Sequence, residues 1–120
     1  MATVIVVDDE EVLLHMMVAL IEECGHRVMP ATNGREALEL LSSEAEPPAL
    51  VISDVMMPQF NGTDLTLALK DHPRFRDVPV VLMSAAGRPP SGHAADAFIH
   101  KPFDLDVLEA VIERYIRHAS

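Results

Sequence analysis

Apolar and polar residues alternate along the chain in blocks that predict strands and helices in turn. Short apolar or β-branched runs predict strands at residues 3–7, 26–31, 50–54, 78–83 and 97–99. Longer segments with apolar residues at helical spacing predict helices at residues 12–24, 35–45, 61–71 and 105–118. Strands that alternate with helices predict an α/β domain, in which right-handed crossovers build a parallel sheet with helices on both faces.

Two of these elements allow a more detailed prediction. In the first helix Leu13, Met17, Leu20 and Cys24 recur at helical spacing, so they predict the buried face, with Cys24 packed at the helix end. The second strand contains Pro30, which has no backbone N–H to donate. We therefore expect this strand at an edge of the sheet, where the missing donor costs little.

The connection between the fourth and fifth strands is unsuited to a full helix. It contains Gly87-Arg88-Pro89-Pro90-Ser91-Gly92, which excludes an ordinary helix interior. Only residues 93–96 remain before the last strand, about one helical turn. We expect the fourth helix of this α/β pattern to be short, missing or disordered.

Length, composition and charge narrow the class of protein. The 120 residues suffice for one domain, 1–120, and a hydrophobic content of 49% favours a folded core. The formal net charge of -10 argues against direct binding to nucleic acid or to an anionic membrane, because both need a basic face. One cysteine allows no internal disulfide, and no stretch resembles a signal peptide or membrane span. The expected location is the cytoplasm.

Chemically suggestive side chains follow four of the five predicted strands. They are Asp8 and Asp9, Asp54, Ser84 and Lys101. Each has a plainer explanation when taken alone, such as a turn-capping Asp or a solvated lysine. In a parallel sheet, however, these strand ends meet at one edge, where ligands bind. Three neighbouring carboxylates repel one another unless a cation lies among them, and their hard oxygens suit Mg²⁺, or Mn²⁺.

The same edge carries groups suited to phosphoryl transfer. A hydroxyl from Ser84 and an ammonium from Lys101 can bind phosphate oxygens opposite the carboxylates. Catalysis of phosphoryl transfer rests mainly on positioning and on neutralising charge. Asp54, the most central carboxylate, is the expected nucleophile, because aspartyl phosphate is an established covalent species.

Taken together, these motifs resemble the receiver domain of two-component response regulators over essentially the whole chain. The matching stretches are Val7-Asp8-Asp9-Glu10, Ser53-Asp54-Val55-Met56-Met57-Pro58 with Gly62, Met83-Ser84-Ala85, and Lys101-Pro102-Phe103. The resemblance implies a flavodoxin-like, doubly wound, five-stranded parallel sheet of strand order 2-1-3-4-5. It also implies that Asp54 takes a phosphoryl group from a sensor histidine kinase or a histidine phosphotransfer domain, and relays it by a conformational change to a downstream protein. Such a domain catalyses only its own phosphorylation and dephosphorylation.

The resemblance further implies how the site is divided between metal and phosphoryl group. Asp9, Asp54 and the backbone carbonyl of Met56 would bind Mg²⁺, and Asp8 would act mainly through a metal-bound water. The phosphoryl oxygens would be contacted by Ser84, Lys101 and the Ala85 amide.

Two conformational features also follow from the resemblance. The Lys101–Pro102 peptide bond should be cis, which tertiary contacts can impose because the isomer preference before proline is small. A switch would couple Ser84 to Phe98, and it would rest on ring packing because phenylalanine has no hydroxyl.

Two other classes of protein remain open from the sequence. A Mg²⁺-dependent phosphatase usually pairs its nucleophilic Asp with a second Asp two residues on, where this chain has Met56. A pseudo-receiver would be a docking module with an inactive site, and the complete set of acidic, hydroxyl and lysine side chains argues against it. The sequence does not separate a stand-alone receiver from one that belongs to a longer chain.

Overall fold

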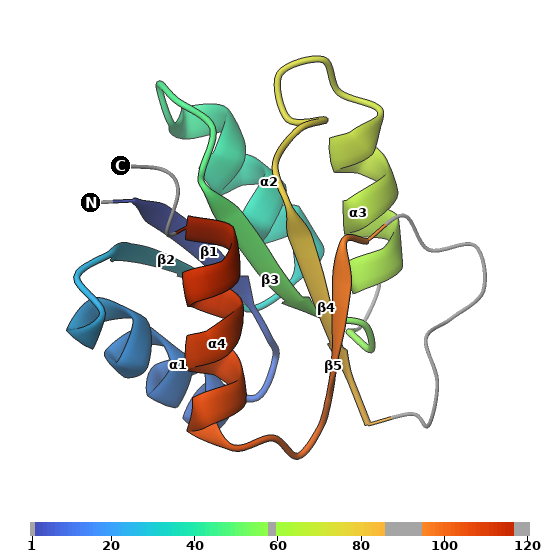
Figure 1. Ribbon diagram of the computed structural model, residues 1–120. Coiled ribbons are helices and arrows are strands. Elements are labelled where there is room, and N and C mark those ends of the chain that lie inside the picture. The colour runs from blue at the N-terminus through green and yellow to red at the C-terminus, as the bar shows by residue number, and fades with distance from the viewer. Residues whose placement is uncertain (1, 58–59, 86–94, 117–120) are drawn as a thin grey trace.

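The described part of the chain forms one parallel sheet with helices on both faces (Figure 1). The structure is a computed structural model, and it describes residues 2–57, 60–85 and 95–116. The elements in chain order are β1 (Thr3–Val7), α1 (Glu11–Glu23), β2 (Arg27–Ala31), α2 (Gly34–Ser43), β3 (Leu50–Asp54), α3 (Gly62–Lys70), β4 (Val80–Ser84), β5 (Ala97–His100) and α4 (Leu105–Ile116). The strand order is β2-β1-β3-β4-β5 and every neighbouring pair is parallel, which confirms the predicted flavodoxin-like topology.

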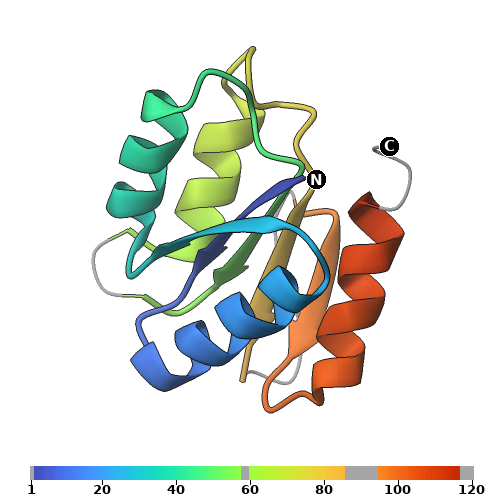
Figure 2. The same cartoon turned by 90° about the vertical axis from the view of Figure 1, so that its left-hand side faces the viewer.

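The helices form two layers, with α1 and α4 on one face of the sheet and α2 and α3 on the other (Figures 1 and 2). Successive side chains of β1 alternate between the two cores: Val4 and Val6 pack toward α1 and α4, and Ile5 and Val7 pack toward α2 and α3. Since both faces of the strand are covered, all four side chains are fully buried. This explains why the strand is a continuous β-branched run and not an alternating one.

Prolines account for the edge position of one strand and for the start of another. β2 lies at the edge of the sheet, as predicted from Pro30. β4 begins at Val80 and not at Val78, because Pro79 cannot donate to the ladder. Pro79 still accepts a hydrogen bond from the Val51 N–H through its carbonyl, at 3.0 Å. Val78 is buried, so its apolar character serves the core and not the strand.

The buried face of α1 differs from the predicted one. Cys24 is the C-cap residue and is exposed, and Leu13 and Leu20 are only half-buried. The residues that the helix buries are Leu14, Met17 and Ile21. Apolar residues stand side by side at 13–14 and at 20–21, so the spacing alone allows two faces. The position of the helix on the sheet selects between them.

The expected state of the fourth helix and the expected cytoplasmic location both stay predictions. The fourth helix expected to be short, missing or disordered falls on residues 86–96, of which 86–94 lie outside the described residues; Ala95 and Asp96 are not helical. In the part of the chain that the structure describes, no helix has both the length and the apolar character needed to cross a bilayer. The cytoplasmic location is not tested by this finding.

Candidate functional site

The strand order brings the predicted side chains to one edge of the sheet. Asp8 follows β1, Asp54 is the last residue of β3, Ser84 is the last residue of β4, and Lys101 follows β5. The ladder pairs Asp54 with Met83 and Ser84 with His100, so the ends of the three strands lie within one residue of one another. Positions far apart in the sequence therefore meet because each parallel strand ends at this edge.

Three carboxylates form the centre of the site. Asp8, Asp9 and Asp54 each offer an oxygen, and these oxygens all lie within 4.8 Å of one another. Asp8 is fully buried and Asp54 is 5% exposed, whereas Asp9 is exposed to solvent. The group is thus open on the side of Asp9 and enclosed around the other two side chains.

In the described part of the chain, one ammonium group lies against this acidic centre. Lys101 Nζ is 2.9 Å from Asp8 Oδ2, 3.3 Å from Asp54 Oδ2 and 3.1 Å from Glu10 Oε1. The Lys101 side chain is only 12% exposed, so solvent screens these contacts weakly. One cation is therefore shared among three carboxylates.

The charges shift the pKa values of the central pair. Burial raises the pKa of Asp54, and the negative charge of Asp8 raises it further; Lys101 and the Met56 N–H act in the opposite direction without cancelling the rise. Burial lowers the pKa of Lys101, but its polar contacts with Asp8 and Glu10 and the charges of Asp8 and Asp54 outweigh this effect, so the net shift is upward. Lys101 therefore stays charged, and keeping Asp54 ionised in the folded state costs free energy.

The residues present fit a divalent cation. Asp8 Oδ2 is buried and accepts no hydrogen bond of regular geometry among the described residues, although the Lys101 ammonium lies close to it. The ligand atoms that Asp8, Asp9 and Asp54 offer to a metal are hard carboxylate oxygens. Mg²⁺ and Mn²⁺ bind such oxygens together with water. Asp9, Asp54 and Asp8 would hold such an ion. The Met56 N–H lies 3.4 Å from Asp54 Oδ1, and the role of the Met56 carbonyl as a ligand stays a prediction.

The start of α3 packs closely against the backbone of Asp54. Gly62 N donates to Val55 O at 3.1 Å, and a Cβ built on Gly62 would lie 2.3 Å from the carbonyl oxygen of Asp54. The absence of a side chain thus lets the start of α3 approach β3. Asn61 caps α3 in a capping box with Asp64.

The remaining predicted residues lie around this centre. Ser84 is buried, and its carbonyl accepts the Lys101 N–H at 2.8 Å; Ala85 follows in an exposed bend. The Lys101–Pro102 bond is cis, as expected. Phe98 is half-buried against the core under α2 and α3, with its ring centroid 5.9 Å from that of His100. The phosphoryl contacts of Ser84 and Ala85 and the switch role of Phe98 stay predictions.

Sequence reasoning missed the role of Glu10. The sequence placed it only within the stretch Val7-Asp8-Asp9-Glu10 and gave it no role, yet its carboxylate pairs with Lys101, 91 residues away in sequence. Its backbone N–H also donates to Asp8 Oδ1 at 2.8 Å. The one available signal was its place directly after Asp8 and Asp9 at the same strand end.

Comparison with known proteins identifies the family. The family model for the response regulator receiver domain matches residues 4–113, and the chain belongs to this family. "Response regulator Rre1" of Synechocystis sp. is 38% identical over 120 residues, which covers 95% of this chain and 51% of that protein. The chain spans about half the length of the first curated relatives that it matches.

Two further similarities concern receivers in different settings. The "Polar-differentiation response regulator DivK" of Brucella anthropi is 28% identical over 122 residues, 98% of both chains. Among solved structures, the receiver domain of a signal transduction histidine kinase from Syntrophus aciditrophicus superposes with a TM-score of 0.90 at 32% identity, covering 98% of this chain and 91% of that one. Receivers of this kind thus occur alone and inside longer proteins.

Proposed function

We propose that this chain is a phosphoacceptor signalling domain, in which Asp54 takes a phosphoryl group in a Mg²⁺-dependent reaction. The observation that carries the proposal is the joint position of Lys101 Nζ, 3.3 Å from Asp54 Oδ2, and of three carboxylates whose oxygens lie within 4.8 Å of one another. A nucleophilic carboxylate, a cation-binding acidic group and a fixed ammonium are the parts that phosphoryl transfer needs.

The donor in this proposal is a phosphohistidine of a sensor histidine kinase or of a histidine phosphotransfer domain. A carboxylate oxygen of Asp54 forms a bond to phosphorus while the phosphorus–nitrogen bond breaks. The electron pair stays on the imidazole nitrogen of the donor, which can take a proton from solvent. Asp8, Asp9 and Asp54 would hold Mg²⁺, which would supply positive charge near the phosphoryl oxygens when bound.

Lys101 is the residue whose partners must change during this reaction. Its ammonium neutralises Asp8 and Asp54 before the phosphoryl group arrives, and it then binds a phosphoryl oxygen. The Ser84 hydroxyl and the Ala85 amide would supply further donors. Attack by water on the aspartyl phosphate would release inorganic phosphate and restore the Asp54 carboxylate, so the chain would catalyse only its own phosphorylation and dephosphorylation.

The phosphorylated domain would signal by a change of shape to a downstream protein. In the proposal Ser84 turns toward the phosphoryl group and Phe98 follows by repacking against the core beside it. Since the chain spans about half of the first relatives that it matches, the output belongs either to a separate protein or to a further part of a longer one.

The experiment that tests the proposal is intact-mass spectrometry after incubation with a small phosphodonor and Mg²⁺. We expect the mass of one phosphoryl group to be added, and to be absent with Asp54→Ala or with a chelator. Folded protein that gains no mass in any sample would contradict the proposal and favour the inactive docking module. Release of phosphate from outside substrates at multiple turnover would favour the phosphatase, against which the exposed Met56 at the position of its second Asp already argues.

A further inference from the structure

Lys101 directly follows β5, the shortest of the five strands in the sheet. β5 has four residues, lies at an edge and pairs with β4 alone. Ile99 is its one fully buried side chain. A slip of one residue would turn every side chain of the strand to the other face and would displace Lys101 by one position. Burial of β5 therefore specifies its register weakly, although the site depends on it.

Asp96, the residue before β5, contacts β4 in a way that only one register permits. The Asp96 N–H donates to Val80 O at 2.8 Å, and the Val80 N–H donates to Asp96 Oδ2, also at 2.8 Å. The first pair of the regular ladder is Val81 with Ala97, so this two-way contact lies directly before the ladder, between the two residues that precede its first pair. A side-chain oxygen here does what a backbone carbonyl does in a strand.

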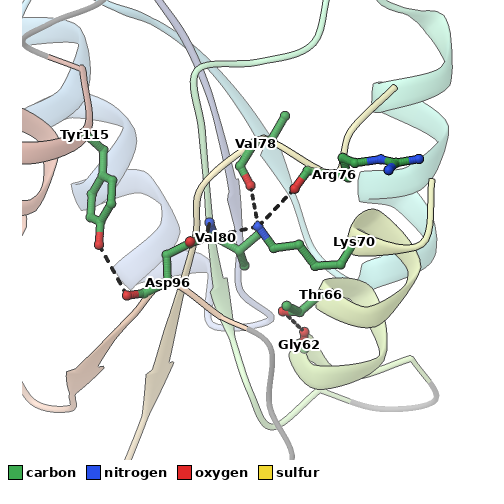
Figure 3. A network of polar contacts seen from close by, with 8 residues as sticks. All are labelled: Gly62, Thr66, Lys70, Arg76, Val78, Val80, Asp96 and Tyr115. Carbon is green, nitrogen blue, oxygen red and sulfur yellow. Dashed lines mark hydrogen bonds and ion pairs between the residues drawn. The ribbon is translucent and has the colours of Figure 1, made fainter. Parts of the chain in front are cut away.

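The same carboxylate is held by α3. Lys70 Nζ donates to Asp96 Oδ2 at 3.1 Å and to Val78 O at 2.9 Å, just ahead of β4 (Figure 3). Tyr115 Oη of α4 donates to the Asp96 carbonyl at 3.4 Å. We call Lys70, Val80, Asp96 and Tyr115 the Asp96 cluster. It joins α3, β4 and α4 at the point where β5 begins.

At the other end of β5, one backbone hydrogen bond ties the strand to the site. The Lys101 N–H donates to Ser84 O at 2.8 Å, next to the ammonium contacts with Asp8 and Asp54. The strand is thus fixed at both ends by polar contacts, with few buried groups between them. A surface ion pair such as Lys70–Asp96 adds little stability by itself. We therefore expect the cluster to affect the position of β5 more than the stability of the fold.

We propose that Asp96 is a positioning residue for Lys101: the Asp96 cluster sets the register of β5 and thereby places the ammonium beside Asp54. The effect on phosphorylation rests on the function proposed above, whereas the effect on β5 does not. Mg²⁺ would be bound by residues of β1 and β3 and the loops that follow them, so loss of the cluster should leave Mg²⁺ affinity unchanged.

The test compares Asp96→Ala and Lys70→Met with Glu44→Ala and Arg27→Met. The control pair, Arg27–Glu44 at 2.8 Å, is an ion pair at the opposite edge of the sheet, with no part in β5. Asp96→Asn keeps an acceptor for the Val80 N–H and should restore much of the effect. Three quantities are measured: amide hydrogen exchange at Lys101, the rate of phosphorylation by a small phosphodonor, and the Mg²⁺ dissociation constant.

We expect Asp96→Ala to speed exchange of the Lys101 N–H and to slow phosphorylation, each by about tenfold or more, with the Mg²⁺ dissociation constant within about twofold of wild type. Lys70→Met should change exchange in the same direction, and the control variants should change neither rate. Should Asp96→Ala fail to fold, Lys70→Met against Arg27→Met decides the question by Lys101 exchange.

Two results would overturn the proposal. One is wild-type exchange at Lys101 in folded Asp96→Ala. The other is a loss of Mg²⁺ affinity by the same factor as the loss of rate, which would mark general loosening of the fold. If wild-type protein takes no phosphoryl group, the proposed function fails, but faster Lys101 exchange in Asp96→Ala would still support the assignment of the cluster.

Discussion

Lys101 Nζ lies closer to Asp8 Oδ2, at 2.9 Å, than to Asp54 Oδ2, at 3.3 Å. Asp8 is also the more deeply buried of the two carboxylates. The ammonium therefore neutralises the residue that has least access to water, and it reaches Asp54 as a second partner. The two carboxylates therefore depend on the same cation. Removing the charge of Asp54 and removing the charge of Lys101 should have different effects.

Asp54→Asn should stabilise the protein in the absence of divalent metal. Burial and Asp8 raise the pKa of Asp54, so the folded state binds a proton more readily than the unfolded state does. The ionised side chain thus destabilises the fold at neutral pH, and wild type regains that stability as the pH falls through the raised pKa. We expect a gain on the order of 1 kcal/mol at pH 7, shrinking toward about pH 4.

Thermal unfolding with a chelator, followed over this pH range, measures the difference. Asp77→Asn removes an exposed carboxylate and serves as the control. If wild type were more stable than Asp54→Asn at neutral pH, the attraction between Lys101 and ionised Asp54 would outweigh the cost of burying the Asp54 charge.

Lys101→Met should act in opposite directions on stability and on metal binding. Removing the ammonium leaves Asp8 buried without a counter-charge, which should cost roughly 3 kcal/mol in metal-free protein. The same change removes a competitor for the carboxylates, so Mg²⁺ should bind more tightly. Chemical denaturation with a chelator and titration calorimetry with Mg²⁺ check the two parts. Weaker Mg²⁺ binding in a folded variant would contradict the competition.

Glu10→Gln should change the reaction more than the fold. The Glu10 side chain is 64% exposed, so its pair with Lys101 contributes little stability, below about 0.5 kcal/mol. Its charge nevertheless competes for the ammonium and repels an anionic donor. We expect phosphorylation by a small phosphodonor to be faster by roughly twofold to fivefold. Glu11→Gln, one residue on and also exposed, is the matched control. An equal or slower rate in Glu10→Gln would show that Glu10 assists Lys101.

Gly62→Ala should be the most damaging glycine substitution near the site. The added methyl would lie 2.3 Å from Asp54 O and 3.0 Å from Leu82 Cδ2, and the backbone contact cannot be relieved by a rotamer change. We expect a loss of about 2–3 kcal/mol from overpacking.

Gly25→Ala is the comparison for this variant. A Cβ there meets nothing within 4 Å, and its cost comes only from the positive φ of 92°, about 1 kcal/mol. Urea denaturation of both proteins ranks them, and equal losses would mean that the loop at Gly62 moves freely away from β3.

The sequence pattern by itself predicted five strands, their parallel direction and the groups at their ends, and the family resemblance supplied the strand order. A strand covered on both faces is mostly apolar: β1 is apolar after Thr3, and β3 is apolar until Ser53 and Asp54, the polar residues that mark its end. Parallel strands end at one edge, so the positions of Asp8, Asp54, Ser84 and Lys101 followed from short-range pattern and topology alone.

Only the tertiary structure decided which partners these elements meet. Leu13 and Leu14 are both apolar, and the placement of α1 on the sheet chose Leu14 for the core. Glu10 meets Lys101 across 91 residues, and Lys70 meets Asp96 across 26. Periodicity reports the face of one element and carries no information on the distance between two. Ion pairs and register contacts therefore arise only after packing has set the elements side by side.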